Sequence, residues 1–273
     1  MKFQKIQGIG NDYIYIDNLR DQIDLKSLPS LSIKMSDRHF GIGSDGVITV
    51  GKSHIADFKM NIFNSDGSEA EMCGNGIRGF VRYLIKNGLL QKDRCEVETK
   101  AGIKPVAYKN NIFTVNMGAP ELNPIKVPVK LEGDMIIDHP IVVLDRDYRI
   151  TCVSMGNPHC ILFTKNLNKA DVQGIGKEIE QSNIFPNRTN VEFVQIISKD
   201  EIKMRVWERG SGETLACGTG ACASLVASVL NEKTHRKVKI HLLGGDLEVN
   251  WNVDDDIIMS GPAEFVFEGK WEH

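Results

Sequence analysis

Two stretches of the 273-residue chain share one pattern: Phe63-Asn-Ser-Asp-Gly-Ser-Glu-Ala-Glu-Met-Cys73-Gly-Asn-Gly76 and Trp207-Glu-Arg-Gly-Ser-Gly-Glu-Thr-Leu-Ala-Cys217-Gly-Thr-Gly220. In each, an apolar run typical of a strand is followed by a polar loop, then Cys-Gly-x-Gly, then a segment with helical periodicity. The two cysteines lie 144 positions apart (217 minus 73), about half the chain length. The pattern therefore predicts a chain made of two similar halves.

A second pair of motifs supports this duplication. Gly10-Asn11-Asp12 near the N-terminus matches Gly156-Asn157-Pro158, at an offset of 146 positions (157 minus 11). Two motif pairs in the same order predict matched cysteines that face each other across a pseudo-twofold interface. The segment 118–123, which contains Gly118-Ala-Pro120, has the composition of a turn or linker. We therefore expect halves of residues 1–117 and 118–261.

Short apolar runs separated by glycine- and asparagine-rich turns predict a strand-rich fold with few helices. The clearest helical segments are 77–86 and 221–230, followed by 33–38 and 171–181. The expected strands are 3–6, 13–17, 46–50, 58–63, 96–99, 112–117, 141–143, 151–154, 160–163, 191–195, 202–207, 238–241, 247–251 and 257–260.

Composition and charge exclude several classes of protein. The net charge of -3 gives no overall basic field for nucleic acid or an anionic membrane. The N-terminus lacks the apolar core of a signal peptide and no later segment reaches the length of a membrane span, so we expect a cytoplasmic protein with reduced cysteines. The six cysteines contain no C-x-x-C pair, which argues against a zinc ribbon or a thioredoxin-like site. We expect no metal and no cofactor, because no candidate pyridoxal lysine is evident and the G-x-G-x-x-G string at 41–46 precedes an expected strand rather than a helix.

The paired cysteines carry the predicted chemistry. Each precedes a Gly-x-Gly that opens a helix, where unsatisfied backbone N–H groups and the helix dipole favour a carboxylate and lower the pKa of an adjacent thiol. Two such thiols can flank one carbon, with one acting as thiolate base and the other as thiol acid. This arrangement suits inversion of an amino-acid α-carbon without a cofactor, and it leaves open which cysteine, Cys73 or Cys217, is the base in which direction. The other four cysteines lack the flanking glycines and are interpreted as structural.

Polar residues beside these loops are candidate substrate ligands. Asn11 and Asn157 lie in the paired Gly-Asn turns, and Asn64 and Glu208 each stand nine positions before a cysteine. Arg209 can bind a carboxylate bidentately. His159 can adjust a thiol by pairing with it, and a structural role for this histidine is an equal alternative.

The motifs resemble those of diaminopimelate epimerases over nearly the whole chain. The resemblance rests on the following blocks: Phe3-x-Lys5-x-x-Gly8-x-Gly10-Asn11-Asp12, Phe40-Gly-Ile-Gly43, Asn64 through Arg78, Met155-Gly-Asn157-Pro-His159, Asn187 through Phe193, and Glu208 through Ala221. It implies a pyridoxal-independent isomerase that interconverts LL- and meso-diaminopimelate in lysine and peptidoglycan-precursor biosynthesis. It also implies an α/β (α+β) fold of two pseudo-symmetric domains, each a β-barrel-like sheet around a central helix, with the C-terminal strand (about 262–273) returning to the first domain.

The resemblance also assigns site residues and an assembly. Cys73 and Cys217 are then catalytic, and the substrate-binding residues are Asn11, Asn64, Gly74, Asn75, Asn157, Asn190, Glu208, Arg209, Gly218 and Thr219. His159 and Glu208 adjust the thiols, and the protein is a cytoplasmic homodimer. Two positions depart from the family pattern: Ser44, near which some members place a substrate contact, and Gly79, where many members carry another cysteine.

Three other functions compete with this interpretation. A proline or hydroxyproline racemase uses the same two-cysteine chemistry, but the asparagine-rich loops and Glu208-Arg209 fit a second amino-carboxylate end better than a pyrrolidine ring. A redox-active dithiol or metal-binding protein would join Cys73 and Cys217 directly, and we expect such a disulfide only as an inactive oxidised form. A noncatalytic binding protein would leave two activated thiols without a role.

Overall fold

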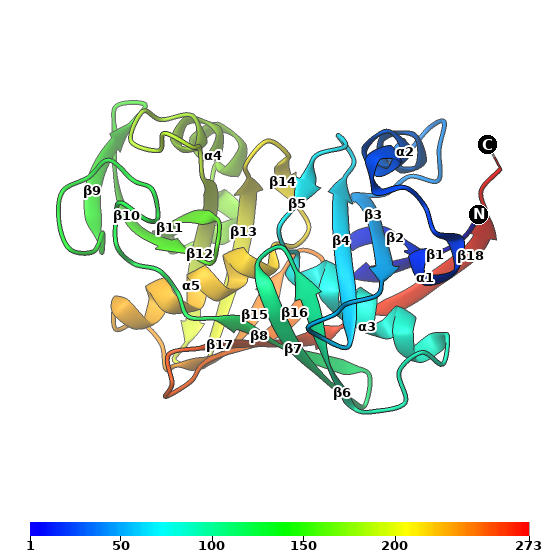
Figure 1. The fold of residues 1–273 in the computed structure, drawn as a ribbon. Coiled ribbons are helices and arrows are strands. Elements are labelled where there is room, and N and C mark those ends of the chain that lie inside the picture. Colours follow the sequence, from blue (N-terminus) through cyan, green and yellow to red (C-terminus); the bar gives the residue numbers. More distant parts are fainter. Residues whose placement is uncertain (273) are drawn as a thin grey trace. The chain divides into compact units, whose positions relative to one another are not determined.

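The computed structural model describes residues 1–272 and divides into two compact units. Unit 1 comprises Met1–Asn116 and the C-terminal segment from Ser260, and unit 2 comprises Met117–Met259. Each unit is mixed α/β, with more strands than helices (Figure 1). None of the helices within residues 1–272 is long and apolar enough to cross a membrane.

Unit 1 is built on a sheet in which most neighbouring strands are antiparallel. Its elements are β1 (Lys2–Gly8), β2 (Asn11–Asp17), α1 (Asn18–Asp21), η1 (Leu25–Ser27), α2 (Leu28–Ser36), β3 (Gly46–Gly51), β4 (Phe58–Asn64), β5 (Glu69–Ala70), α3 (Gly74–Lys86), β6 (Arg94–Thr99), β7 (Gly102–Lys109), β8 (Ile112–Gly118) and β18 (Glu264–Lys270). The strands pair in the order β18-β1-β2-β3-β4-β6-β7-β8, and β5 pairs with β4. Only β2–β3 and β4–β6 are parallel, because helical segments connect those strands.

Unit 2 repeats this plan. Its elements are β9 (His139–Val143), β10 (Arg146–Ser154), β11 (Pro158–Phe163), η2 (Leu167–Lys169), α4 (Val172–Glu180), β12 (Asn190–Ser198), β13 (Glu201–Glu208), β14 (Gly212–Thr214), α5 (Gly218–Leu230), β15 (Lys237–Leu242) and β16 (Gly245–Trp251). The strand β17 (Ile257–Pro262) contains the boundary at which the chain re-enters unit 1. The pairing order is β9-β10-β11-β12-β13-β15-β16, with β14 on β13 and parallel pairs at β11–β12 and β13–β15.

The two units therefore match element by element. Strands β1 to β7 correspond to β10 to β16, α2 to α4 and α3 to α5, with parallel pairs at the same places. Helices α3 and α5 each contain 13 residues and each begin directly after a cysteine. The pseudo-symmetry predicted from the repeated sequence motifs is confirmed.

One long helix lies against the sheet of each unit. Helix α5 contacts β10, β11, β12, β13, β15 and β16, and α3 contacts β1, β2, β3, β7 and β18 (Figure 1). Residues Gly218 to Ser228 of α5 are buried almost without interruption, as expected for a helix that is apolar on all sides. Each helix that follows a cysteine is thereby fixed to the sheet of its own unit.

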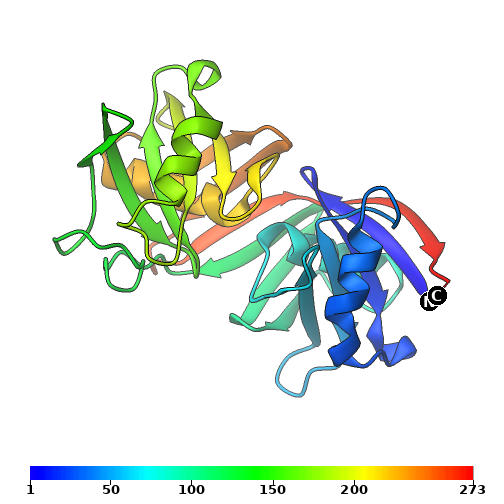
Figure 2. The ribbon, with the colours of Figure 1, turned by 90° about the horizontal axis from the view of Figure 1, so that it is seen from above.

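A second, shorter helix covers the other face of each sheet (Figure 2). In unit 1, Leu28, Leu31 and Met35 of α2 pack in one core cluster with residues of β2 and β3. In unit 2, Ile175 and Ile179 of α4 do the same with residues of β10, β11 and β12. Each sheet is thus packed on both faces, which leaves the strand ends as the positions where polar side chains can gather.

The chain termini lie together in unit 1. Strand β18 pairs with β1 from Lys2↔Lys270 to Gln7↔Glu264, and the N-terminal ammonium donates to the Trp271 carbonyl at 2.9 Å. The last strand of the chain is therefore hydrogen-bonded to the first.

The structure differs from the sequence prediction at several elements, among them the unpredicted helix α1. Helix α2 spans Leu28–Ser36 rather than 33–38, since Pro29 is suited to a helix start and the carboxylate of Asp37 accepts from the next turn instead of continuing the helix. Strand β7 was not predicted, because Pro105 interrupts its apolar run. The short strands β5 and β14 fall inside segments predicted as loops.

The glycine at position 79 is explained by Tyr15. A Cβ added to Gly79 would lie 2.2 Å from the Tyr15 hydroxyl oxygen, and that hydroxyl donates to the Gly76 carbonyl at 2.9 Å. In this chain the tyrosine occupies the space in which a side chain at position 79 would lie.

We predict that Gly79→Ala destabilises the protein by about 1–3 kcal/mol, the usual cost of overpacking a core. The measurement is the Tm by differential scanning calorimetry, with Gly51→Ala as control, because a Cβ there meets nothing closer than 3.6 Å. Combining Gly79→Ala with Tyr15→Leu should cost less than the sum of the two single changes. Strict additivity would contradict this explanation.

Candidate active site

Each cysteine is the N-cap of its helix. Cys73 has extended backbone angles and its Sγ accepts from the Gly76 N–H at 3.3 Å. Cys217 has the same conformation, and its Sγ accepts from the Gly220 N–H at 3.4 Å. Both sulfur atoms therefore lie at the positive end of a long helix, as the Cys-Gly-x-Gly motif predicts.

The last glycine of each motif lies in close contact with a side chain of a neighbouring strand. A Cβ on Gly76 would lie 2.8 Å from Ile48 Cδ1, and a Cβ on Gly220 would lie 2.6 Å from Glu192 Oε1. Glycine thus allows the first helical turn to approach the neighbouring strand.

In unit 1 the predicted residues Asn11, Cys73, Gly74 and Asn75 gather around the start of α3. The Cys73 thiol is 3.4 Å from Asn11 Oδ1, and the Asn11 amide N–H group donates to Asp45 Oδ2 at 2.6 Å. Because the amide nitrogen is held by Asp45, the carbonyl oxygen of Asn11 is directed at the thiol. The Asp45 pKa is raised, because burial and the nearby Asp12 disfavour its charged form.

Other residues near Cys73 are aromatic or structural. Burial, followed by the adjacent Cys73 and Asp45, raises the pKa of Tyr13 well above its usual value, so its hydroxyl stays protonated. Asn64, at the end of β4, donates its amide to Ser68 Oγ at 3.0 Å within a tight turn. Ser44 is buried and donates to the Gly46 carbonyl at 2.9 Å, which is a structural role.

In unit 2 a larger cluster of polar side chains surrounds Cys217. Asn157 donates to Thr219 Oγ1 at 3.3 Å, and that hydroxyl lies 3.5 Å from Cys217 Sγ. The Asn157 carbonyl oxygen lies 3.0 Å from His159 Nε2. His159 is fully buried, and its other nitrogen, Nδ1, pairs with Glu192 Oε1 at 2.7 Å. A continuous chain of hydrogen bonds therefore connects Glu192 to the thiol.

The predicted residues Asn190 and Arg209 lie next to this cluster. Asn190 donates to the Pro158 carbonyl at 3.1 Å and accepts from the Arg209 backbone N–H at 2.9 Å. The exposed Arg209 guanidinium donates to the Asn187 carbonyl at 3.1 Å. Asn190 thus fixes the loop after β13, and the Arg209 side chain remains accessible to solvent.

The pKa of Cys217 is raised, opposite to the direction predicted from the helix end. Burial is the largest cause, and the carboxylates of Glu208 and Glu192 add to it. Hydrogen bonds from Thr219 and Gly220 oppose this effect without reversing it. Cys217 is 6% exposed, so the prediction was wrong at this thiol because it considered the helix dipole but neither burial nor the two acids.

Glu208 has its own raised pKa. Burial of the carboxyl is the main cause and the nearby Glu192 adds to it, while hydrogen bonds with Thr214 and Cys217 and the charge of His159 oppose them. The acid and the thiol therefore lie close enough to influence each other's protonation.

Sequence reasoning missed Glu192, Tyr13 and Asp45 as site residues. Glu192 lies within the motif 187–193, and the signal that could have identified it is an acid within the otherwise apolar run 191–194. Tyr13 and Asp45 lie in segments that also read as ordinary strand and loop.

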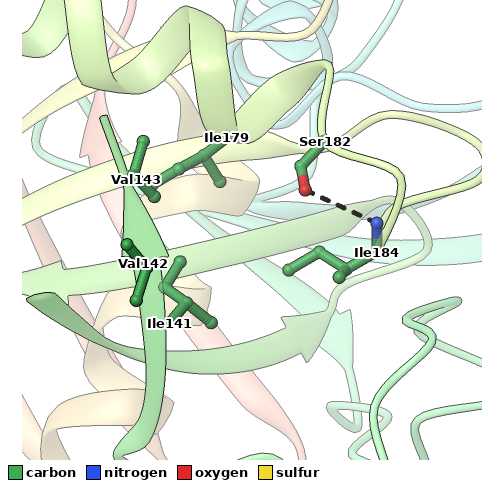
Figure 3. A pocket seen from close by; sticks show the side chains of 6 residues that line it. All are labelled: Ile141, Val142, Val143, Ile179, Ser182 and Ile184. Atoms are coloured by element: carbon green, nitrogen blue, oxygen red, sulfur yellow. Dashed lines mark hydrogen bonds between the residues drawn. The ribbon is translucent and has the colours of Figure 1, made fainter. Parts of the chain in front are cut away.

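A small apolar cavity of about 220 Å³ lies elsewhere in unit 2, between β9 and α4 (Figure 3). Its lining consists of Ile141, Val142, Val143, Ile179, Ser182 and Ile184. Ser182 Oγ already accepts from the Ile184 N–H at 3.5 Å (Figure 3). None of the lining residues is acidic or basic, so this cavity offers no acid–base chemistry.

The fold defines a two-unit, pseudo-symmetric α/β protein, and solved structures of other proteins share this fold. It is similar to a phenazine biosynthesis protein of the PhzF family from Bacillus anthracis, with TM-score 0.72 and 19% identity over 98% of both chains. It is also similar to a probable proline racemase from Agrobacterium radiobacter, with TM-score 0.71 and 13% identity over 99% of this chain and 92% of that one. These likenesses concern the fold alone.

Sequence comparison identifies the family within that class. The model of the diaminopimelate epimerase family matches residues 3–123 and 151–266. The chain is 48% identical to the diaminopimelate epimerase of Acetivibrio thermocellus over 99% of this chain and 98% of that protein. It is 49% identical to the diaminopimelate epimerase of Methanococcus maripaludis over 99% of both. The chain belongs to the diaminopimelate epimerase family.

The two glycines should tolerate alanine unequally. The closest atom to the Cβ added in Gly76→Ala is the flexible end of Ile48, and alanine gains about 0.5–1 kcal/mol of helix propensity, so we expect a Tm close to wild type. Gly220→Ala meets Glu192, which is held by His159, and we expect a loss of about 1–3 kcal/mol. Equal Tm values for the two variants would show that Glu192 is not held in place.

Proposed function

We propose that this protein interconverts LL- and meso-2,6-diaminopimelate, with Cys73 and Cys217 as the two acid–base groups. The observation that supports this most strongly is the match between two thiols that cap equivalent helices in two equivalent units of a diaminopimelate epimerase family member. Because the chain resembles diaminopimelate epimerases in sequence, we also propose that it acts in lysine and peptidoglycan-precursor biosynthesis.

In the proposed reaction one sulfur, as thiolate, removes the α-proton and becomes a thiol. The electron pair left on carbon is delocalised into the substrate carboxylate, and the other thiol delivers its proton to the opposite face and becomes a thiolate. Protons and charge balance, and the two sulfurs exchange states in each turnover. No group besides these thiols is needed to accept or supply the proton.

The helix ends stabilise the charge that develops. Backbone N–H groups at the starts of α3 and α5 are positioned to donate to a carboxylate, and they strengthen their interaction as negative charge accumulates on it. Gly74, Asn75, Gly218 and Thr219 belong to these turns and are proposed substrate ligands. Asn11, Asn64, Asn157, Asn190, Glu208 and Arg209 are proposed for the remaining polar groups, with His159 and Glu208 adjusting the thiols.

The test of this function is α-proton exchange in deuterated water with fresh reductant, followed by NMR on LL-diaminopimelate. Wild type should incorporate deuterium and form the meso isomer, while Cys73→Ala and Cys217→Ala each lose epimerisation by at least about 10²-fold, because one acid–base group is missing. Cys95→Ala is the control, since Cys95 is a buried residue of β6 that the proposed reaction does not use.

Two outcomes would point elsewhere. Exchange of proline but not of diaminopimelate would retain the two-thiol chemistry with a different substrate. Inactivity toward both substrates, with the thiols verified as reduced, would favour the redox alternative.

We further propose that the protein acts in the cytoplasm as a homodimer, as the family resemblance implies. Multi-angle light scattering after gel filtration should then give twice the 30.5 kDa chain mass. A monomer mass at micromolar concentration would refute the dimer.

A further inference from the structure

Glu192 lies beneath the first turn of α5 and is enclosed by the protein. Its side chain is fully buried on β12, Oε1 pairs with His159 at 2.7 Å, and within residues 1–272 Oε2 has no hydrogen-bond partner. A buried carboxylate is costly unless its interactions compensate for lost hydration. One oxygen of Glu192 is left without such compensation.

The matched position in unit 1 holds an apolar residue. In the parallel pair β2–β3, Tyr15 is opposite Ile48, and in the matched pair β11–β12, Ile161 is opposite Glu192. The Ile48 side chain lies against Gly76 in unit 1, and the Glu192 side chain lies against Gly220 in the same way in unit 2. The same fold therefore accepts an isoleucine at this position, so the carboxylate in unit 2 is not a requirement of the architecture.

The pairing of Glu192 with His159 is also specific to unit 2. By the same register, the counterpart of His159 is Tyr13, since Tyr13 is opposite Gly46 on β3 and His159 is opposite Asn190 on β12. Unit 1 thus places an uncharged aromatic residue and an isoleucine near its thiol, where unit 2 places a histidine and an acid.

Ionisable groups on three neighbouring elements face Glu192, and Glu192 also adds to the effect of burial in raising the pKa of Cys160. The facing groups are His159 on β11, Glu208 on β13 and Cys217 at the start of α5. Cys160 is on the other face of the sheet, in the core formed with α4, which packs there through Ile175 and Ile179. Glu192 therefore adds negative charge on the side of the sheet where Cys217 lies.

We propose that Glu192 is a positioning residue that, paired with His159, makes the two matched thiols chemically unequal and keeps Cys217 in its protonated form before substrate binds. The carboxylate holds the imidazole, which in turn orients Asn157 toward Thr219 and the sulfur. The raised pKa of Cys217 agrees with this role, since Glu192 is among its causes. The proposal rests on the proposed function only in treating Cys217 as a proton donor.

The test measures each thiol separately and does not depend on turnover. The full-length protein is alkylated with iodoacetamide across a pH series, and peptide mass spectrometry gives the pH midpoint for Cys73 and for Cys217. In Glu192→Gln the Cys217 midpoint should fall by about one pH unit, the effect expected of one removed like charge, while the Cys73 midpoint stays at its wild-type value.

Two further variants separate a specific effect from general damage. Glu192→Ile copies the residue of unit 1 and should also lower the Cys217 midpoint. Glu180→Gln removes another buried carboxylate of the same unit, which binds the Trp207 indole N–H at 2.8 Å, and should leave both midpoints unchanged. Tm values and circular dichroism identify any variant that does not fold.

The outcomes are distinct from those for the proposed function. An unchanged Cys217 midpoint in folded Glu192→Gln and Glu192→Ile, or equal shifts at both cysteines, would overturn the role of Glu192. If the midpoints shift as expected and diaminopimelate is not epimerised, the role of Glu192 stands and the proposed substrate fails.

Discussion

The hydrogen bond from the third helical N–H to a cysteine sulfur is the interaction on which each half of this protein depends. It fixes the thiol at the start of a 13-residue helix that lies against the sheet, so the sulfur cannot move without the core moving. Glycine at positions 76 and 220 lets the first helical turn lie close to the neighbouring strand, where an added Cβ would meet Ile48 or Glu192. The Cys-Gly-x-Gly motif therefore provides both the helix start and the sulfur atom, and it does so once in each half of the chain.

Duplication produced equal geometry but unequal environments. Both sulfurs cap equivalent helices, yet Cys73 contacts Asn11, which Asp45 holds, whereas Cys217 is surrounded by Glu208 and the Glu192–His159 pair. A reaction that removes a proton on one face of a carbon and returns one on the other needs two groups in different protonation states at the start of each turnover. Different neighbours around matched sulfurs provide such a difference without altering the backbone.

Features that repeat in the sequence were predictable, and features that depend on contacts between distant strands were not. The repeated Cys-Gly-x-Gly and Gly-Asn motifs predicted the pseudo-symmetry and the helix starts, because local patterns determine them. The pKa direction at Cys217 was predicted wrongly, since it depends on acids supplied by β12 and β13 that no local pattern connects to residue 217. Strand β7 was missed for a related reason: Pro105 disfavours a strand locally, but pairing with Glu96 on β6 accommodates it.

The pairing of the last strand with the first has a consequence for biosynthesis. Unit 2 is a single continuous segment, Met117–Met259, whereas the sheet of unit 1 includes β18, which ends at Lys270. During translation the second half of the chain can therefore complete its own sheet while the first half still lacks its final strand. Until residues 264–270 have been synthesised, the β1 edge of unit 1 stays open to other chains.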